Sequence, residues 1–222
     1  MKNTVVALFV RVPLPGRVKT RLAVHLGDAG ACRFYQAMVA DLLRNLPACG
    51  LPLYLFHDGI DGRELPVEWV QASTKVIAQN GGDIGERMAA AFAHCFAEGV
   101  KQVILVGSDL PGLDATMIGA AAMALQKHDV AIAPTVDGGY GLIALKQTTY
   151  HPSLFQEILW SSDQVLDSTV AKCAERRLRV ALLDHLQDID TIDDLKAYSQ
   201  KIAPHAVATN RYLASSGFLP GD

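Results

Sequence analysis

The feature that most constrains the fold is a repeated alternation of short apolar runs with segments of helical periodicity. Between the runs, apolar residues recur every four positions, in one series that starts at Phe34 and another that starts at Ile84, which is the spacing of one helix face. Strands that alternate with helices form βαβ units, and uniformly apolar strands are typical of a parallel sheet covered on both faces. The sequence therefore predicts an α/β, Rossmann-like fold of three α/β/α layers around a mostly parallel sheet. The expected strands are residues 5–10, 53–57, 76–79, 103–106, 130–133, 142–145 and 179–183.

The composition fits one domain. Half of the 222 residues are hydrophobic and 19% are charged, which is enough apolar material for a full core. We assign residues 1–203 to a single domain and residues 204–222, which lack clear patterning, to a loosely attached C-terminal tail. The four cysteines form no CxxC pair, so we expect them to be reduced core residues.

Charge and hydropathy exclude two classes of partner. The net charge of −3 provides no basic field for binding nucleic acid. No apolar run approaches the roughly 20 residues that cross a bilayer. We expect a soluble, cytoplasmic protein that binds small molecules; the sequence does not give its oligomeric state.

The loop after the first expected strand concentrates positive charge around a helix start. At such a start, backbone N–H groups and the helix dipole favour an anion, so the loop is predicted to bind phosphate. A P-loop is excluded because it would need glycines at positions 13 and 18, which are Pro13 and Val18. The alternative is a solvated loop with scattered charges. The candidate phosphate-binding residues are Arg11, Pro13, Gly16, Arg17, Lys19 and Arg21.

A second loop, residues 79–88, joins the third expected strand to an amphipathic helix. Its glycines allow a backbone to approach a flat ligand closely, and the Gln79 amide could recognise the edge of a base. A turn that needs positive φ at Gly81 and Gly82 would explain the same pattern. The candidate nucleotide-binding residues here are Gln79, Gly81, Gly82, Asp83 and Arg87.

A third cluster, Ser108 and Asp109, follows the strand expected at the centre of the sheet. An Asp at the carboxyl end of a central strand directs its carboxylate into the crevice where ligands of parallel sheets bind. Mg²⁺ that bridges phosphate oxygens needs oxygen ligands of this kind. The alternative is a carboxylate that caps the following turn.

A fourth cluster combines the glycine-rich segment 137–141 with the acidic segment 188–191. Asp137 could bind hydroxyls of a sugar or acceptor, and Asp190 would approach a metal from the side opposite Asp109. Asp188 and Asp190 could instead be helix-start acids that the dipole favours. Helix starts are indicated at Ser161, with Gln164 three residues later, and at Thr191, with Asp194 three residues later.

In their order, these clusters resemble the radical-SAM and selenodomain-associated transferase 1 family, a glycosyltransferase-like group of the nucleotide-diphospho-sugar transferase (GT-A) fold. The resemblance extends from about residue 4 to residue 200. It implies the GT-A fold, but it does not settle the reaction. The motifs that carry it are PxPGxVKTRL (13–22), GGDIGERM (81–88), GSDLPGL (107–113), PTxDGGYGLIAL (134–145), Trp160 with Ser161, and DIDTxDDL (188–195).

More distantly, the chain is similar to the molybdenum-cofactor and 2-phospholactate guanylyltransferases and to the N-acetylglucosamine-1-phosphate uridylyltransferases. This similarity implies that Gln79 contacts the base and that Asp109 and Asp190 hold Mg²⁺ or Mn²⁺. The chain departs from these relatives in the proline-bearing phosphate loop. It departs from glycosyltransferases at Gly107, where they usually carry the first Asp of an Asp-x-Asp motif. The residues then expected to bind the sugar or acceptor are Asp137, Gly138, Gly139, Tyr140, Gly141 and Trp160.

The sequence as a whole predicts a metal-dependent transferase that binds a nucleoside triphosphate or a nucleotide sugar, with Lys19, Arg21 and Asp109 as catalytic residues. Nucleotidyl transfer to a small phosphorylated acceptor is favoured, because a loop with several cations suits a pyrophosphate leaving group. Glycosyl transfer from a nucleotide sugar is the alternative. A non-catalytic nucleotide-binding module is the alternative of another class.

Overall fold

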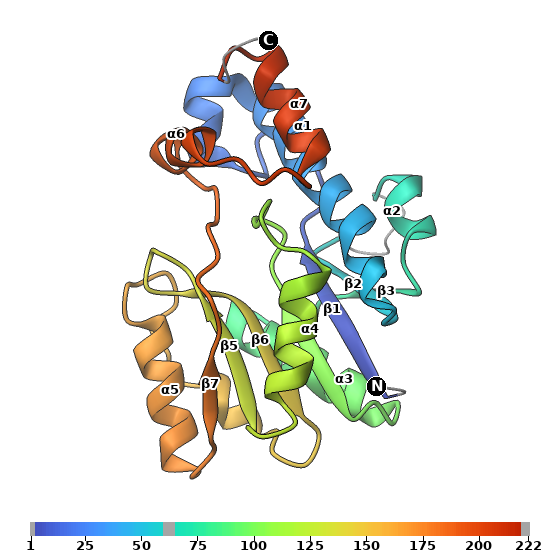
Figure 1. Cartoon of the computed structure of the whole chain (residues 1–222), viewed down its shortest axis with the longest axis vertical. Coiled ribbons are helices and arrows are strands. Elements are labelled where there is room, and N and C mark those ends of the chain that lie inside the picture. Colours follow the sequence, from blue (N-terminus) through green and yellow to red (C-terminus); the bar gives the residue numbers. More distant parts are fainter. Residues whose placement is uncertain (1–2, 60–64, 219–222) are drawn as a thin grey trace.

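The computed structural model describes residues 3–59 and 65–218, which contain a seven-stranded sheet in the order β3-β2-β1-β4-β6-β5-β7 (Figure 1). Only β6 runs antiparallel to its neighbours, so the predicted mostly parallel sheet is confirmed. All seven expected strands are present, with ends that differ from prediction by at most two residues. They are β1 (Thr4–Val10), β2 (Leu53–His57), β3 (Lys75–Ala78), β4 (Gln102–Val106), β5 (Val130–Pro134), β6 (Tyr140–Lys146) and β7 (Val180–Leu182).

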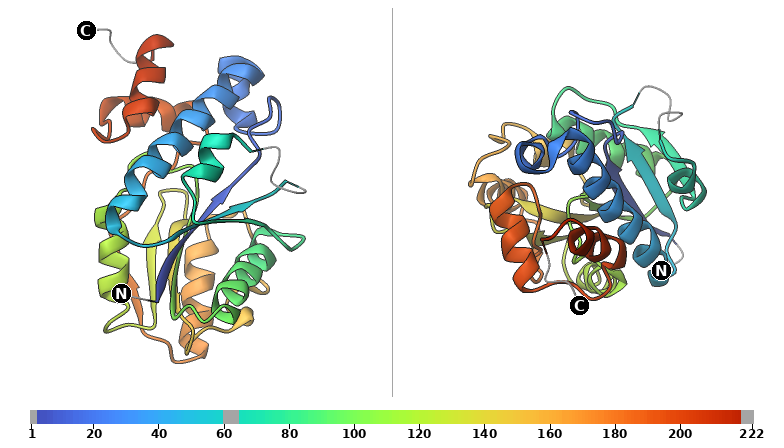
Figure 2. Two further views of the ribbon diagram at one scale, coloured as in Figure 1. Left: turned by 90° about the vertical axis from the view of Figure 1, so that its right-hand side faces the viewer. Right: turned by 90° about the horizontal axis from the view of Figure 1, so that it is seen from above.

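Helices cover both faces of the sheet, as the apolar strands predict. One face carries α1, α2 and α4, and the other carries α3 and α5; Figure 2 shows the sheet between α4 and α3. The helices are α1 (Thr20–Asn45), α2 (Val67–Gln71), α3 (Ile84–Ala97), α4 (Ala115–Ala124), α5 (Val165–Glu175), α6 (Ile192–Gln200) and α7 (Val207–Ser215), with short 3₁₀ turns η1 (Leu46–Cys49) and η2 (Pro152–Phe155).

The strands alternate their side chains between two apolar cores. On β1, Leu8 faces the core under α1 and α4, while the neighbouring Ala7 and Phe9 face the core under α3 and α5. The two predicted helix stripes supply part of each core: the stripe from Phe34 belongs to α1, and Met88 and Phe92 belong to α3. The three-layer arrangement therefore follows from the period-two strands and the four-residue spacing of the helices.

The four cysteines are free. Three of them, Cys32, Cys95 and Cys173, are buried, and Cys49 is partly buried. Burial raises the pKa of each of the three buried thiols, which keeps them protonated and poorly nucleophilic. This agrees with the predicted reduced core residues.

Of the two predicted helix starts, one is right and one is wrong. Thr191 caps α6 and forms a capping box with Asp194. Ser161 has a left-handed backbone, with φ 65°, and α5 begins only at Val165. A serine needs an extended backbone to cap a helix, so the spacing of Ser161 and Gln164 was not enough.

Part of the predicted tail is firmly attached. Residues 207–215 form α7, which packs along α1, and Leu213 is completely buried. The fully buried carboxylate of Asp41 accepts hydrogen bonds of 2.8 Å from the backbone N–H groups of Ala208 and Thr209. A loose attachment is therefore wrong for this segment, while residues 219–222 lie outside the described part of the chain.

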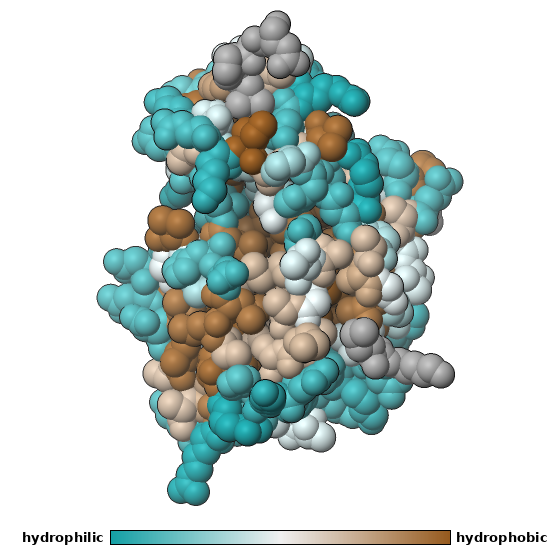
Figure 3. Space-filling model, in the orientation of Figure 1, coloured by the Kyte–Doolittle hydropathy of each residue, from teal (hydrophilic) through white to brown (hydrophobic). Residues whose placement is uncertain are grey.

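The surface is uneven in polarity. On the face drawn in Figure 3, apolar residues gather around β7 and α4, where Leu182 is 61% and Met123 65% exposed. Among the described residues, no helix is both long and apolar enough to cross a membrane.

Candidate functional site

The carboxyl edge of the sheet is where the candidate residues meet. β1 and β4 lie side by side, and the chain leaves them in opposite directions, towards β2 and towards β6. In open α/β sheets a crevice forms at such a switch point, and ligands bind in it. Because β6 is antiparallel, it starts at this same edge, and Gly107 donates a backbone hydrogen bond of 3.0 Å to Gly141 there.

A cleft of about 970 Å³ opens over this edge. It brings together eleven of the predicted site residues, from all four sequence clusters: Arg11, Lys19, Arg21, Gln79, Gly82, Asp83, Arg87, Ser108, Asp109, Asp137 and Asp190. The remaining predicted residues are not among those that line the cleft: Pro13, Gly16, Arg17, Gly81, Gly138, Gly139, Tyr140, Gly141 and Trp160.

Lys19 lies at the centre of the polar contacts in the cleft. Its ammonium is 2.9 Å from Asp109 Oδ1 and 3.7 Å from Asp190 Oδ1, and it donates to the Ile189 carbonyl at 2.5 Å. The Ile189 N–H in turn donates to the Asp109 carbonyl at 3.0 Å. Three segments far apart in sequence are thereby joined around one cation.

The surroundings of Lys19 are asymmetric. Its side chain is only 3% exposed, whereas those of Asp109 and Asp190 are 47% and 42% exposed. Its backbone is left-handed, with φ 49°, which is uncommon for a residue other than glycine. Arg21 is 72% exposed and contacts the second oxygen of Asp190 at 3.2 Å. The two carboxylates therefore face the open cleft while the lysine lies beneath them.

Gln79 presents one defined end of its amide to the cleft. Its Nε2 group donates to the backbone carbonyls of Val10, at 3.3 Å, and Phe56, at 3.0 Å. These carbonyls belong to the ends of β1 and β2, so the assignment of nitrogen and oxygen follows from the hydrogen bonds. The carbonyl oxygen is then the atom left to accept a hydrogen bond from a ligand.

The loop before α3 is closed by its own contacts. Asp83 caps the helix by accepting from Glu86 N–H, and the Glu86 carboxylate accepts from Gly82 N–H at 2.7 Å. Gly81 has φ 136°, and a Cβ there would lie 2.7 Å from Glu86 Cβ. The alternative that this glycine serves the turn is therefore supported, while Arg87, held to the Gly81 carbonyl at 3.1 Å, reaches the cleft.

The glycine-rich loop before β6 is folded onto itself. Asp137 accepts hydrogen bonds from the Thr135 hydroxyl and from Gly139 N–H. Gly138 has φ 84° and lies so close to the backbone of Asp163 that a Cβ could not fit. This close approach fixes the segment around residue 163 against the cleft edge.

Two of the residues predicted to bind substrate lie elsewhere for clear reasons. The Tyr140 hydroxyl is buried beside Thr169 and Cys173 of α5, in the core below the sheet. The Trp160 ring packs on the start of α3, where a Cβ at Gly85 would come within 2.5 Å of it. Both side chains therefore pack in the structure that supports the loops around the cleft and do not line it.

Tyr35 and Asp188 are among the cleft residues that were not predicted as site residues. Tyr35 of α1 lies on the floor of the cleft, hydrogen-bonded to Ser108 and to the Arg11 N–H. Asp188, weighed above only as a helix-start acid, also lines it. Burial, together with the charges of Asp137 and then Asp194, raises the pKa of Asp188 to about 6.

The carboxylates of the cleft could supply some, but not all, of the ligands of one divalent metal ion. Among the described residues, no group of three or more His, Cys, Asp or Glu side chains is arranged to hold a metal. Asp109 and Asp190 do converge on one point, each with an oxygen near the same nitrogen. Mg²⁺ is commonly held by one or two carboxylates while water and substrate phosphates complete its shell. Two half-exposed carboxylates in a cleft that also contains Arg11, Arg21 and Arg87 suit that mode.

Residues 42–162 match the family described as "Uncharacterized protein conserved in bacteria (DUF2064)". The chain belongs to this family. No curated protein sequence matches it significantly. The finer resemblance to the radical-SAM and selenodomain-associated transferases stays a prediction.

Three solved structures share this fold. A protein from Desulfovibrio desulfuricans G20, provisionally named a nucleotide-diphospho-sugar transferase, shares 31% sequence identity with a TM-score of 0.88, over 99% of this chain and 100% of that one. A 4-diphosphocytidyl-2C-methyl-D-erythritol synthase from Anaerococcus prevotii DSM 20548 shares 11% sequence identity with a TM-score of 0.57, over 96% of this chain and 97% of that one. A cytidylyltransferase from Leptospira borgpetersenii shares 10% sequence identity with a TM-score of 0.55, over 97% of this chain and 95% of that one. The predicted nucleotide-diphospho-sugar transferase fold is thereby confirmed.

Proposed function

We propose that this protein is a metal-dependent nucleotidyltransferase that couples a nucleoside triphosphate to a small phosphorylated acceptor. The observation that carries the proposal is the convergence of Lys19, Asp109 and Asp190 at the switch point between β1 and β4. Phosphoryl chemistry in such sites is promoted by positioning and by neutralisation of charge. Both need a cation and metal-binding carboxylates in one crevice.

The triphosphate is proposed to lie among the arginines of the cleft. Arg11, Arg21 and Arg87 line the cleft together with Lys19, and guanidinium groups bind phosphate oxygens through paired, charge-assisted hydrogen bonds. Lys19, beneath Asp109 and Asp190, offsets their negative charge, so that the phosphates and the departing pyrophosphate meet less repulsion from the two carboxylates.

Asp109 and Asp190 would hold Mg²⁺ or Mn²⁺. When bound, such an ion would offset the negative charge of the phosphates, as divalent cations do in phosphoryl transfer. The residues' own contribution is to keep two carboxylates directed at one point, which Lys19 and Arg21 achieve by pairing with them.

The acceptor is proposed to enter over Asp137 and the glycine-rich loop, on the side of the cleft away from Gln79. Its phosphate oxygen attacks the α-phosphorus and forms the new P–O bond, while the bond to the β-phosphate oxygen breaks and releases pyrophosphate. The Gln79 carbonyl oxygen suits a base with a donor at its edge, such as the amino group of cytosine or guanine or the imino N–H of uracil.

The proposal is tested first by binding. The melting temperature of the protein is measured with each ribonucleoside triphosphate and with a panel of nucleotide sugars, each in Mg²⁺ and in EDTA. A nucleotide at about 100 times its dissociation constant should add about 2.7 kcal/mol of stability. If no triphosphate and no nucleotide sugar shifts the melting temperature, the result would contradict both transferase hypotheses and the hypothesis of a non-catalytic nucleotide-binding module.

Turnover then separates the two transfer reactions. Pyrophosphate release from a triphosphate, dependent on a sugar 1-phosphate or a small phosphorylated acid, supports nucleotidyl transfer. Release of a nucleoside diphosphate from a nucleotide sugar, dependent on a hydroxyl acceptor, would favour glycosyl transfer instead. We favour the first because Gly107 provides no second carboxylate beside Asp109, and its N–H is engaged with Gly141. A protein that binds nucleotide but turns over neither kind of donor would fit the non-catalytic module.

A further inference from the structure

A chain of three hydrogen-bonding groups crosses the floor of the cleft. The backbone N–H of Arg11 donates to the Tyr35 hydroxyl at 2.8 Å, and the Tyr35 and Ser108 hydroxyls lie 2.9 Å apart. Tyr35 is 2% and Ser108 7% exposed. The chain links the end of β1 to the end of β4, next to Asp109.

The direction of the hydrogen bond between the two hydroxyls follows from the burial of Tyr35. Burial and then the negative charge of Asp109 raise the pKa of Tyr35, so its hydroxyl keeps its proton. A buried hydroxyl proton needs an acceptor. Among the described residues, the Ser108 oxygen is the only acceptor that Tyr35 contacts, because the Arg11 N–H is itself a donor. Tyr35 therefore donates and Ser108 accepts.

This direction leaves the Ser108 proton available. A serine hydroxyl has one proton and two lone pairs, and one lone pair is occupied by Tyr35. In the described part of the chain, Ser108 has no other side-chain hydrogen bond, and it lines the cleft. Its remaining donor is directed at whatever the cleft holds beside Asp109.

We propose that Tyr35 is a positioning residue that orients the Ser108 hydroxyl as a donor to a phosphate oxygen of the bound nucleotide. This inference rests on the proposed function, since it assigns a phosphate to the space beside Asp109. Tyr35 touches neither the nucleotide nor the reacting atoms. Its hydroxyl acts only through Ser108.

The test is a double-mutant cycle on affinity. Binding is measured by calorimetry with Mg²⁺ and with whichever of ATP, CTP, GTP and UTP binds the wild type most tightly. Ser108→Ala should weaken binding about 10-fold, because it removes a hydrogen bond to a charged group. Tyr35→Phe should weaken binding about 3- to 10-fold, since it removes only the hydroxyl that orients Ser108. In the Ser108→Ala background, Tyr35→Phe should change affinity by less than about 2-fold.

A matched control separates positioning from stability. Tyr150 also uses its hydroxyl in a hydrogen bond, which it donates to the Ala89 carbonyl at 2.8 Å, and it does not line the cleft. Tyr150→Phe should lower the melting temperature and leave affinity unchanged. Tyr35→Phe should also expose the Arg11 amide to faster hydrogen exchange, because that amide loses its acceptor.

The outcomes distinguish the inference from the proposed function. Additive losses in the double variant, or full affinity in Tyr35→Phe, would overturn the role of Tyr35 and leave the nucleotidyltransferase intact. If the wild type binds none of the four triphosphates, the proposed function fails and the inference fails with it.

Discussion

Replacement of Lys19 by methionine tests the central contact of the site. Methionine keeps an unbranched side chain of similar length in this buried position and removes the ammonium, with its charge and its hydrogen bond to the Ile189 carbonyl. The left-handed backbone at this position is equally unfavourable for both residues. Any change in stability therefore reports the ammonium and its partners.

The magnitude follows from the geometry. At an effective dielectric constant of about 20, contacts of 2.9 and 3.7 Å each contribute about 4–6 kcal/mol before desolvation. Burying the ammonium costs several kcal/mol, and the half-exposed carboxylates are partly screened by water. We expect Lys19→Met to lower the free energy of unfolding by about 1–3 kcal/mol at pH 7 in EDTA. For a chain of this size, each kcal/mol lowers the melting temperature by about 2–4 °C.

The same variant should respond more strongly to Mg²⁺ than the wild type does. Without Lys19, Asp109 and Asp190 repel each other, and a divalent cation that binds both removes more unfavourable energy. The assay is thermal unfolding in EDTA and in Mg²⁺, with Lys196→Met as the control, because the pair of Lys196 with Asp193 is exposed on both sides and contributes little. An unchanged melting temperature in EDTA, or a Mg²⁺ response no larger than that of the wild type, would refute the reasoning.

Three further changes probe the rest of the cleft. Asp109→Asn should retain the fold and lower the free energy of unfolding by at most about 1 kcal/mol, because the side chain is half exposed. The same variant should abolish pyrophosphate release. Turnover per folded molecule equal to that of the wild type would contradict a metal role. Gly138→Ala should lower the free energy of unfolding, measured by chemical denaturation, by about 2–4 kcal/mol, because its φ of 84° and the Asp163 backbone leave no room for a Cβ. Gly112 has open space around it, so Gly112→Ala should leave the free energy of unfolding nearly unchanged. Asp188 has a folded pKa of about 6, raised from 3.8, so the folded state binds the proton more tightly and stability falls as pH rises from about 4 to 6. Asp188→Asn should therefore match the wild type near pH 4 and exceed it by about 1–2 kcal/mol above pH 6, measured by thermal unfolding in EDTA; equal stability at both pH values would argue against the raised pKa.

Local patterns predicted the fold well because each element carries its own signal. The β-branched runs gave all seven strands, and the apolar series gave the faces of α1 and α3. The rule that ligands bind at the carboxyl ends of parallel strands was enough to bring four loops to one edge. The cap of α6 could also be predicted, since Thr191 and Asp194 form a capping box within four residues.

The contacts that define the site could not be predicted from the sequence, because they join segments that are far apart along the chain. In the sequence, Lys19 is one of several charges in a loop that is expected to be exposed. In the structure it is buried and donates a hydrogen bond to the carbonyl of Ile189, 170 residues away. Tyr35 lies next to the apolar stripe of α1 that starts at Phe34, and no local pattern shows that its hydroxyl reaches Ser108, 73 residues away. The positive φ of Ser161 is likewise set by its surroundings.

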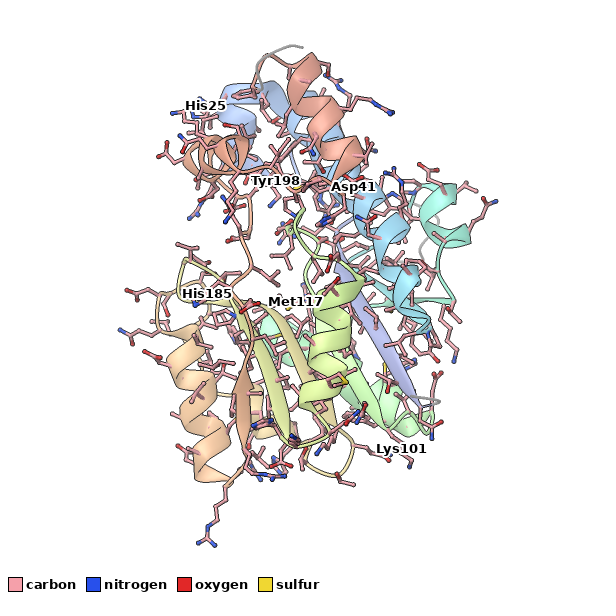
Figure 4. The ribbon with its side chains drawn as sticks, viewed as in Figure 1. His25, Asp41, Lys101, Met117, His185 and Tyr198 are labelled. Carbon is pink, nitrogen blue, oxygen red and sulfur yellow. The ribbon has the colours of Figure 1, made fainter. Side chains whose placement is uncertain are left out.

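The C-terminal helix belongs to the architecture of the site although it contributes no residue to the cleft lining. Helix α1 begins beside Lys19 and α6 begins just after Asp190, so these two helices present opposite sides of the ion cluster. Helix α7 joins them: Asp41 of α1 caps its start, and Tyr198 of α6 donates to Asn210 within it. Figure 4 shows Asp41 and Tyr198 where the three helices meet. Because the distance between Lys19 and Asp190 depends on how α1 and α6 are held, the segment that looked like a tail fixes the geometry on which phosphate and metal binding would depend.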